Sequence, residues 1–207
     1  MNYITFQKRF GNFPLVDMRD VFSVFPHFDR RRINEWQKKG YLKKIANNFY
    51  VFADKPLAEK KIFYIANKIY EPSYVSLETA LGYYGLIPEA VFSILSVSTS
   101  KTKTANADLG AMKTNFLYKK IKKSFYFGYS LKKSEGISFL IADPEKAVLD
   151  FLYLREDLKT EKDFSELRLN GEIAGKTLNS PAMEKYLAIA NSNRLNEKIN
   201  ILKKIYA

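Results

Sequence analysis

Hydrophobic and polar positions in the first fifty residues predict three short helices followed by a β-hairpin. Apolar side chains recur at helical spacing in three segments, residues 4–10, 17–25 and 29–40. Asp17 and Asp29 can cap the second and third helices, and Gly40 is a typical terminator of the third. Asn47 and Asn48 then separate two short apolar runs, residues 41–45 and 49–52, which is typical of a hairpin turn.

A polar break at Asp54, Lys55 and Pro56 follows the hairpin, and we place a domain boundary there, between residues 1–54 and 55–207. The longer part alternates between helical and strand patterns. Helices are expected near residues 62–69, 76–85, 143–155 and 195–205, and a further helix is expected to start at Ser180 and Pro181. Strands are expected at 91–99, 115–121, 125–130 and 137–141. Residues 156–179 are polar and weakly patterned, so we expect a loop or a short helix. The fold class predicted is α+β, an N-terminal winged helix-turn-helix followed by a larger mixed α/β domain.

Composition narrows the classes of function. The chain has 207 residues, 46% of them hydrophobic, which provides material for packed cores and excludes wholesale disorder. It has no Cys and one His, His27, which excludes disulfides, cysteine-ligated zinc and a histidine metal cluster, so we expect no cofactor. No apolar run approaches the roughly 18 residues that span a bilayer, so we expect a cytoplasmic protein without a membrane partner.

The net charge is +12, and nearly all of the excess of Lys and Arg lies in residues 1–130. A concentrated positive field favours a polyanionic partner such as nucleic acid, because binding neutralises phosphates and releases counterions. Solubility alone is the alternative explanation.

The third predicted helix has the residues expected of a DNA-reading helix. An arc of about 120° contains Arg, Asn, Gln and Lys side chains, which read base edges or bind phosphates: Arg30, Arg31, Asn34, Gln37 and Lys38. Ile33 and Trp36 point the other way and would pack on the domain. The alternative is an ordinary surface helix with solvated charges.

A hairpin with Lys43 and Lys44 and a turn at Asn47 follows this helix directly. A wing in this position lays basic side chains along the adjacent DNA backbone or minor groove. The succession of three helices and a wing therefore predicts binding of double-stranded DNA.

Residues 113–133 contain seven lysines and no acidic residue, interleaved with aromatic side chains. Alternation along strands would place lysines on one face and aromatics on the other. A second nucleic-acid surface would then use Lys119, Lys120, Lys122 and Lys123 for phosphates, with aromatic rings available to stack on bases. Alternatively, these rings belong to the core.

Catalytic signatures are weak. His27 lies in a loop with no evident acidic or nucleophilic partner, and helix capping accounts for Asp143 and Glu145. Asp150, Asp157 and Lys159 faintly resemble the acidic and lysine residues of a nuclease, but in a polar stretch after a helix. We therefore expect a protein that is not an enzyme, with a metal-dependent nuclease as an alternative.

Several ordered motifs in residues 1–155 resemble the AbiEi family of antitoxins from type IV toxin-antitoxin systems. They are Tyr74-Val-Ser-Leu-Glu-Thr-Ala-Leu-Gly-Tyr-Tyr, Ser96-Val-Ser-Thr-Ser-Lys-Thr-Lys, Phe116-Leu-Tyr-Lys-Lys-Ile with Phe127-Gly-Tyr, and Ala142-Asp-Pro-Glu-Lys-Ala-Val-Leu-Asp.

The resemblance implies a winged-helix repressor of its own operator and a C-terminal antitoxin domain. It implies a functional partner that looks like a nucleotidyltransferase toxin, counteracted without a stable complex. By position, Arg30, Arg31, Asn34, Gln37 and Lys38 match the family's recognition helix, and Lys43, Lys44 and Asn47 its wing. Winged-helix proteins often bind inverted repeats, which we expect in the operator. A generic winged-helix regulator with a ligand-sensing C-terminal domain is the alternative.

Overall fold

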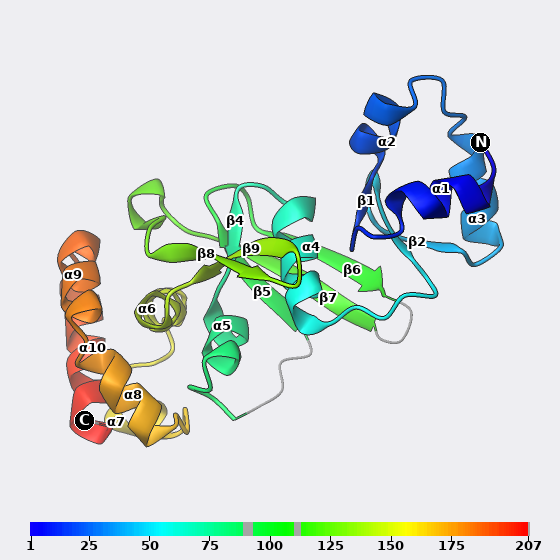
Figure 1. Cartoon of the computed structure of the whole chain (residues 1–207). Helices are drawn as coiled ribbons and strands as arrows, with labels where there is room; N and C mark the ends of the chain where they lie inside the picture. The colour runs from blue at the N-terminus through cyan, green and yellow to red at the C-terminus, as the bar shows by residue number, and fades with distance from the viewer. Residues whose placement is uncertain (89–92, 110–112, 207) are drawn as a thin grey trace.

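The computed structural model describes residues 1–88, 93–109 and 113–206 and has a mixed α+β fold (Figure 1). Helices and a small sheet form the N-terminal region. Its elements are α1 (Tyr3–Phe10), β1 (Val16–Asp17), α2 (Met18–Val24), α3 (Arg31–Lys38), β2 (Leu42–Ala46) and β3 (Phe49–Phe52). The three strands pair antiparallel in the order β1-β3-β2.

Capping explains where the N-terminal helices begin. The Asp17 carboxylate accepts the backbone N–H of Arg19 at 2.8 Å, as expected for the N-cap of α2. Helix α3 begins later than expected, because Arg30 occupies its N-cap position while the Asp29 carboxylate accepts the N–H of Arg31 at 3.0 Å. Strand β1 was not anticipated, since two residues are too few to show an alternating pattern.

The rest of the chain forms a six-stranded sheet with helices around it. Its elements are α4 (Glu59–Ile69), β4 (Ser73–Val75), α5 (Leu77–Tyr83), β5 (Ser93–Ser98), β6 (Lys103–Asp108), β7 (Lys113–Lys120), η1 (Lys123–Phe125), β8 (Tyr129–Ser134), β9 (Ile137–Ala142), α6 (Pro144–Leu154), α7 (Glu161–Ser165), α8 (Gly171–Leu178), α9 (Pro181–Ala190) and α10 (Asn193–Tyr206). The strand order is β6-β7-β5-β4-β9-β8, with β5–β7 and β4–β9 parallel and the other neighbours antiparallel.

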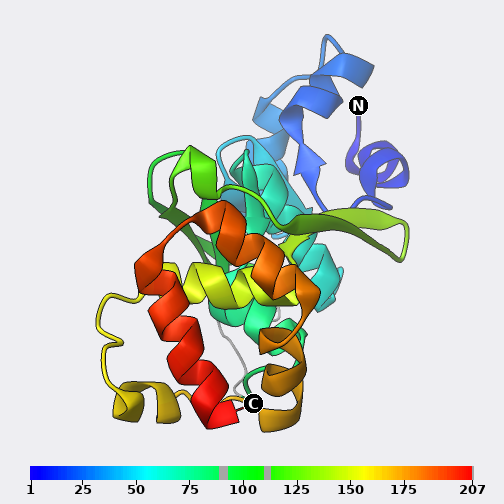
Figure 2. The same ribbon diagram turned by 90° about the vertical axis from the view of Figure 1, so that its left-hand side faces the viewer.

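Helices α4 and α6 cover opposite faces of this sheet. Tyr118 of β7 donates its hydroxyl to the Ala66 carbonyl of α4 at 2.7 Å, whereas Tyr74 of β4 donates to Asp150 of α6 at 3.0 Å. The strand register places Tyr118 and Tyr74 on different faces. Helices α8, α9 and α10 pack around α6, as Figure 2 shows.

Most strands and helices lie close to their expected positions, and the differences have local causes. The strand expected at residues 125–130 is wrong, because a 3₁₀ turn occupies residues 123–125 and β8 begins only at Tyr129, after Gly128 with φ +68°. Strands β4 and β6 were missed. Strand β4 has three residues, and β6 is a polar edge strand without an apolar alternation. Residues 156–179 form α7 and α8, capped by Thr160 and Asn170. Positions 91 and 92 of the strand expected at 91–99 lie outside the described residues.

Two hydrophobic clusters support the two parts of the chain. One contains Phe6, Ile33 and Trp36, and lies within the N-terminal region. The other fills the region around the six-stranded sheet but also includes N-terminal side chains, namely Leu15, Ile45, Phe49 and Val51.

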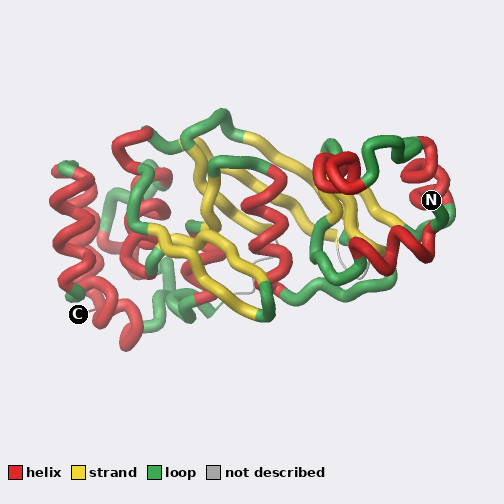
Figure 3. The backbone as a smooth tube through the Cα atoms, turned by 45° about the horizontal axis from the view of Figure 1, so that its top comes forward, coloured by secondary structure: helices red, strands yellow, loops and turns green. Residues whose placement is uncertain are grey.

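Figure 3 shows the N-terminal region at one end of an elongated molecule, the larger sheet in the middle and the C-terminal helices at the other end. None of the helices in the described part of the chain has the length and apolar character required to cross a membrane.

Candidate nucleic-acid interface

Helix α3 is anchored by two buried side chains. Ile33 and Trp36 are 1% and 4% exposed, and the Trp36 ring lies 4.7 Å from Phe6 and 5.9 Å from Phe28, measured between ring centroids. Of the predicted reading residues, four are exposed and Gln37 is half-buried; the exposed ones are Arg30, Arg31, Asn34 and Lys38. The predicted division of this helix into a packed side and an exposed side is confirmed.

Local hydrogen bonds hold several of these exposed groups. Arg30 Nη2 donates to Asn48 Oδ1 at 2.5 Å, which joins the start of α3 to the hairpin turn. Arg31 forms an ion pair with Asp29, with 3.0 Å between Nη2 and Oδ2. The hydrogen bonds that the Arg31 side chain and backbone donate to Asp29 lower the pKa of the Asp29 carboxyl. Gln37 Nε2 donates weakly to the Ile33 carbonyl at 3.4 Å. Helix and hairpin therefore present one connected polar surface.

Lys43 and Lys44 have different neighbours in the structure, although both are predicted from the sequence to belong to the wing. Lys43 lies opposite Val51 of β3 and therefore shares its side of the small sheet, and Val51 packs into the cluster of the larger sheet. Lys43 Nζ lies 2.8 Å from Asp108 Oδ2 of β6. Lys44 and Asn47 are exposed, and within the described residues Lys44 has no ion-pair partner. Of the predicted wing residues, Lys44 and Asn47 are thus exposed, whereas Lys43 is half-buried and paired with Asp108.

The structure does not bring Lys119, Lys120, Lys122 and Lys123 to the hairpin. Asp108, which binds Lys43, pairs in register with Lys113 at the start of β7, whereas Lys119 is six residues further along. At roughly 3.3 Å per residue the two places are about 20 Å apart. All four lysines are exposed.

The aromatic residues interleaved with these lysines are mainly core residues. Phe116 and Tyr118 are 0% exposed and Phe125 is 5% exposed, so these rings are not available to stack on bases. The alternation expected of lysines and aromatics holds only in part, because Lys120 lies on the same face of β7 as Phe116 and Tyr118.

A buried ion pair accounts for the acidic residue that suggested a nuclease. Asp150 forms an ion pair with Lys146 and accepts hydrogen bonds from Ser76 Oγ at 2.7 Å and Tyr74 Oη at 3.0 Å, and both charged side chains are 0% exposed. Burial raises the pKa of Asp150 and lowers that of Lys146, while their mutual attraction opposes both shifts. Ser76, expected to cap α5, uses its hydroxyl for Asp150 instead.

Asp157 and Lys159 do not share this environment. Asp157 pairs with Arg155 at 2.6 Å in an exposed position, and this contact lowers the pKa of Asp157 to about 2. Asp150, Asp157 and Lys159 therefore do not lie on a common surface. In the described part of the chain no group of three or more His, Asp or Glu side chains is arranged to hold a metal ion.

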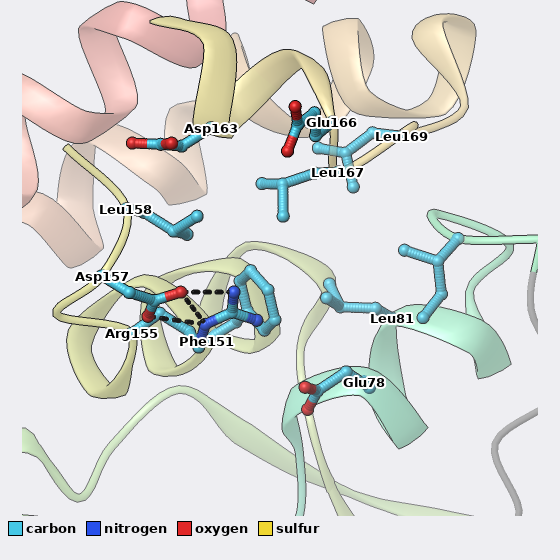
Figure 4. A pocket seen from close by; sticks show the side chains of 11 residues that line it. Glu78, Leu81, Phe151, Arg155, Asp157, Leu158, Asp163, Glu166, Leu167 and Leu169 are labelled. Carbon is cyan, nitrogen blue, oxygen red and sulfur yellow. Dashed lines mark hydrogen bonds and ion pairs between the residues drawn. The ribbon is translucent and has the colours of Figure 1, made fainter. Parts of the chain in front are cut away.

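A cavity of about 490 Å³ lies between α5, α6 and α7 (Figure 4), and the residues that line it include none of the predicted DNA-binding residues. Leu81, Phe151 and Leu158 supply apolar walls, and the Arg155–Asp157 pair lies at one side. Asp163, also at this cavity, accepts the backbone N–H groups of Lys159 and Thr160 at 2.9 and 2.7 Å. This carboxylate is therefore committed to capping α7.

Comparison of the sequence with models of known protein families gives no match, and comparison with curated proteins gives no significant match.

Proposed function

We propose that the N-terminal region is a winged helix-turn-helix that binds operator DNA, and that the protein is a transcriptional repressor. The observation that carries this proposal is the exposed polar side of α3, which Arg30 joins to the hairpin turn through its hydrogen bond to Asn48. The order of elements, helix, strand, helix, helix and hairpin, is the one that winged helices use.

The chemistry of this surface fits double-stranded DNA. Asn34 offers an amide that can pair with adenine in the major groove, and Lys38 and Lys44 offer ammonium groups for phosphates. Arg30 is held at the junction by Asn48, so the helix and the hairpin meet the duplex as one body.

We further propose that the protein is an antitoxin of a type IV, AbiE-like system, in which the region after residue 54 counteracts a nucleotidyltransferase toxin without a stable complex. The motifs that resemble those of AbiEi antitoxins support this role, and they lie mainly in that region. A nucleotidyltransferase gene next to the coding sequence would supply the cognate toxin for a rescue assay. Failure of the full-length protein to rescue cells that make this toxin would contradict the antitoxin role.

A second candidate, a ligand-sensing regulator, is favoured by one observation. A cavity of about 350 Å³ lies between α4 and β8, with Tyr64, Tyr126 and Tyr129 at its walls. Its size is in the range of small-molecule sites. A change of operator affinity caused by a metabolite would favour this candidate.

Operator binding is tested with Asn34→Ala and Lys44→Ala, using fluorescence anisotropy on the upstream region of the gene and on a random duplex. Asn34→Ala should weaken operator binding by about 1–3 kcal/mol and affect random duplex less, because base contacts specify sequence. Lys44→Ala should weaken both and reduce the slope of log affinity against log salt by about 0.9.

Lys185→Ala, an exposed lysine on α9, serves as the control and should change neither affinity beyond the small effect of net charge. Equal losses on both duplexes for Asn34→Ala would mean that α3 does not read sequence. An unchanged salt slope for Lys44→Ala would remove the hairpin from the interface.

A further inference from the structure

Several lysines from two separate segments of the chain gather at one end of the larger sheet. The register of β5, β6 and β7 places Lys103 opposite Tyr118, and Lys119 and Lys120 opposite Val97 and Ser98. The N–H of Ile121 donates to the Ser98 carbonyl at 2.9 Å and brings the residues that follow β7 to the same end. We call these side chains together the lysine patch: Lys101, Lys103, Lys119, Lys120, Lys122 and Lys123.

The lysine patch is a concentrated and uncompensated positive charge. All of its side chains are exposed, and within the described residues none of them forms an ion pair with a carboxylate. Lys119 and Lys120 are consecutive in β7 and face opposite sides of the sheet, so the patch surrounds this end of the sheet rather than covering one face. Its like charges repel one another, and a polyanion relieves that repulsion while it releases counterions.

The patch also has a fixed support. Tyr70 donates its hydroxyl to the Lys101 carbonyl at 2.6 Å, and its ring lies 4.7 Å from Lys103 Nζ. This tyrosine therefore positions the loop between β5 and β6 and holds one ammonium group beside it. A loop fixed in this way loses less conformational entropy when it binds.

Distance separates the patch from α3 and the hairpin. Lys119 lies about 20 Å along β7 from the place where Lys43 meets Asp108. The lysines of the patch are therefore too far away to contact the same phosphates as Lys44 and Asn47. They would contact a different stretch of a bound polyanion.

We propose that the lysine patch is a second site that binds the phosphate backbone of double-stranded DNA without sequence preference. Ammonium groups act as point charges toward phosphates, and Phe116 and Tyr118 beneath the strands are buried, so neither of these rings reads a base. The choice of duplex DNA as the partner rests on the proposed function, whereas the existence of an anion site rests on the patch itself.

The test uses the full-length protein and a quadruple variant, Lys119→Gln, Lys120→Gln, Lys122→Gln and Lys123→Gln. A matched variant with the same change of net charge replaces four exposed lysines elsewhere, at Lys159, Lys162, Lys185 and Lys204. Affinity for a random duplex is measured by fluorescence anisotropy between about 50 and 200 mM salt. The patch variant should lower the slope of log affinity against log salt by about 0.9 for each phosphate that it no longer binds, and the matched variant should leave the slope nearly unchanged.

Three outcomes decide the proposal. Equal slopes for the patch variant and the matched variant would overturn it, because net charge alone would then explain the binding. Tighter, patch-dependent binding of a single-stranded RNA of the same length would overturn duplex DNA as the partner. Asn34→Ala separates this site from the proposed function. If Asn34→Ala leaves operator affinity unchanged, the proposed reading of the operator by α3 fails. If the patch variant still lowers the salt slope on random duplex in that case, the second site stands without the proposed function.

Discussion

Lys146 and Asp150 form an ion pair in which both side chains are 0% exposed. The Lys146 ammonium lies 4.1 Å from the Phe125 ring and 4.9 Å from the Phe127 ring, and Asp150 receives two hydroxyl donors besides the lysine. These contacts replace the hydration that each charge loses. They also tie α6 to β4 and to the turn before β8, so this pair organises the sheet face that α6 covers.

Removal of one partner from this pair should be costly. Asp150→Ala leaves the Lys146 ammonium buried without a counter-charge, and we expect the free energy of unfolding to fall by about 3–5 kcal/mol. Chemical denaturation monitored by circular dichroism measures this change. Asp157→Ala removes one partner of an exposed pair and should have a much smaller effect. If Asp150→Ala lowers the free energy of unfolding no more than Asp157→Ala does, other groups must compensate the buried charge of Lys146.

At the scale of elements, strand β8 is set between two glycines with left-handed backbone. Gly128 precedes the strand with φ +68°, and Gly136 follows it with φ +76°. Their surroundings differ. A Cβ atom on Gly128 would lie 3.1 Å from Lys146 Cβ and from Tyr186 Cε2, whereas nothing lies within 4 Å of a Cβ on Gly136.

Alanine at these two glycines should therefore have unequal effects. Gly136→Ala should cost about 1–2 kcal/mol of unfolding free energy, because only the left-handed backbone penalises it. Gly128→Ala should cost more, because the same backbone penalty is joined by a clash with Lys146 and Tyr186. Thermal and urea melts of both variants test the difference. A Gly128→Ala variant as stable as Gly136→Ala would mean that the side chains around Gly128 move aside easily.

At the scale of the whole molecule, the two regions share an interface. Lys43 pairs with Asp108 across it, and Ile45, Phe49 and Val51 of the small sheet pack into the cluster of the larger sheet. The polar break at residues 54–56 separates the two regions in the sequence, but apolar side chains of both regions pack into one cluster.

A fragment that begins at Lys55 should fold, since it keeps most of the larger cluster, but it should melt at a lower temperature than the intact protein. The loss of Ile45, Phe49 and Val51 uncovers apolar surface, which is the physical reason. Circular dichroism melts measure this effect.

The fragment should lose specific operator binding and, if the antitoxin role lies in this region, still rescue cells that make the cognate toxin. Rescue by residues 1–55 instead, or no rescue by a folded fragment, would overturn this assignment of roles.

Much of this fold follows from local signals. Period and capping residues predict α1, α2 and α6 closely and the start of α9, because a helix buries one stripe of its own sequence. The exposed side of α3 also follows from its sequence, since Ile33 and Trp36 alone are apolar within it. Strands β4 and β6 left no such signal, because a three-residue strand and a polar edge strand owe their pairing to neighbours distant in sequence.

The sequence by itself determined which residues are charged, which helix faces are apolar and where turns can form. Only the tertiary structure decided how equivalent residues differ: Lys43 meets Asp108 while Lys44 faces solvent, and Asp150 enters the core while Asp157 stays outside. It also brought Lys101 and Lys103 beside Lys119–Lys123. The physical reason is that charge and hydrophobicity are local properties of a residue, whereas burial, pairing and electrostatic environment depend on chain segments that meet only when the sheet forms.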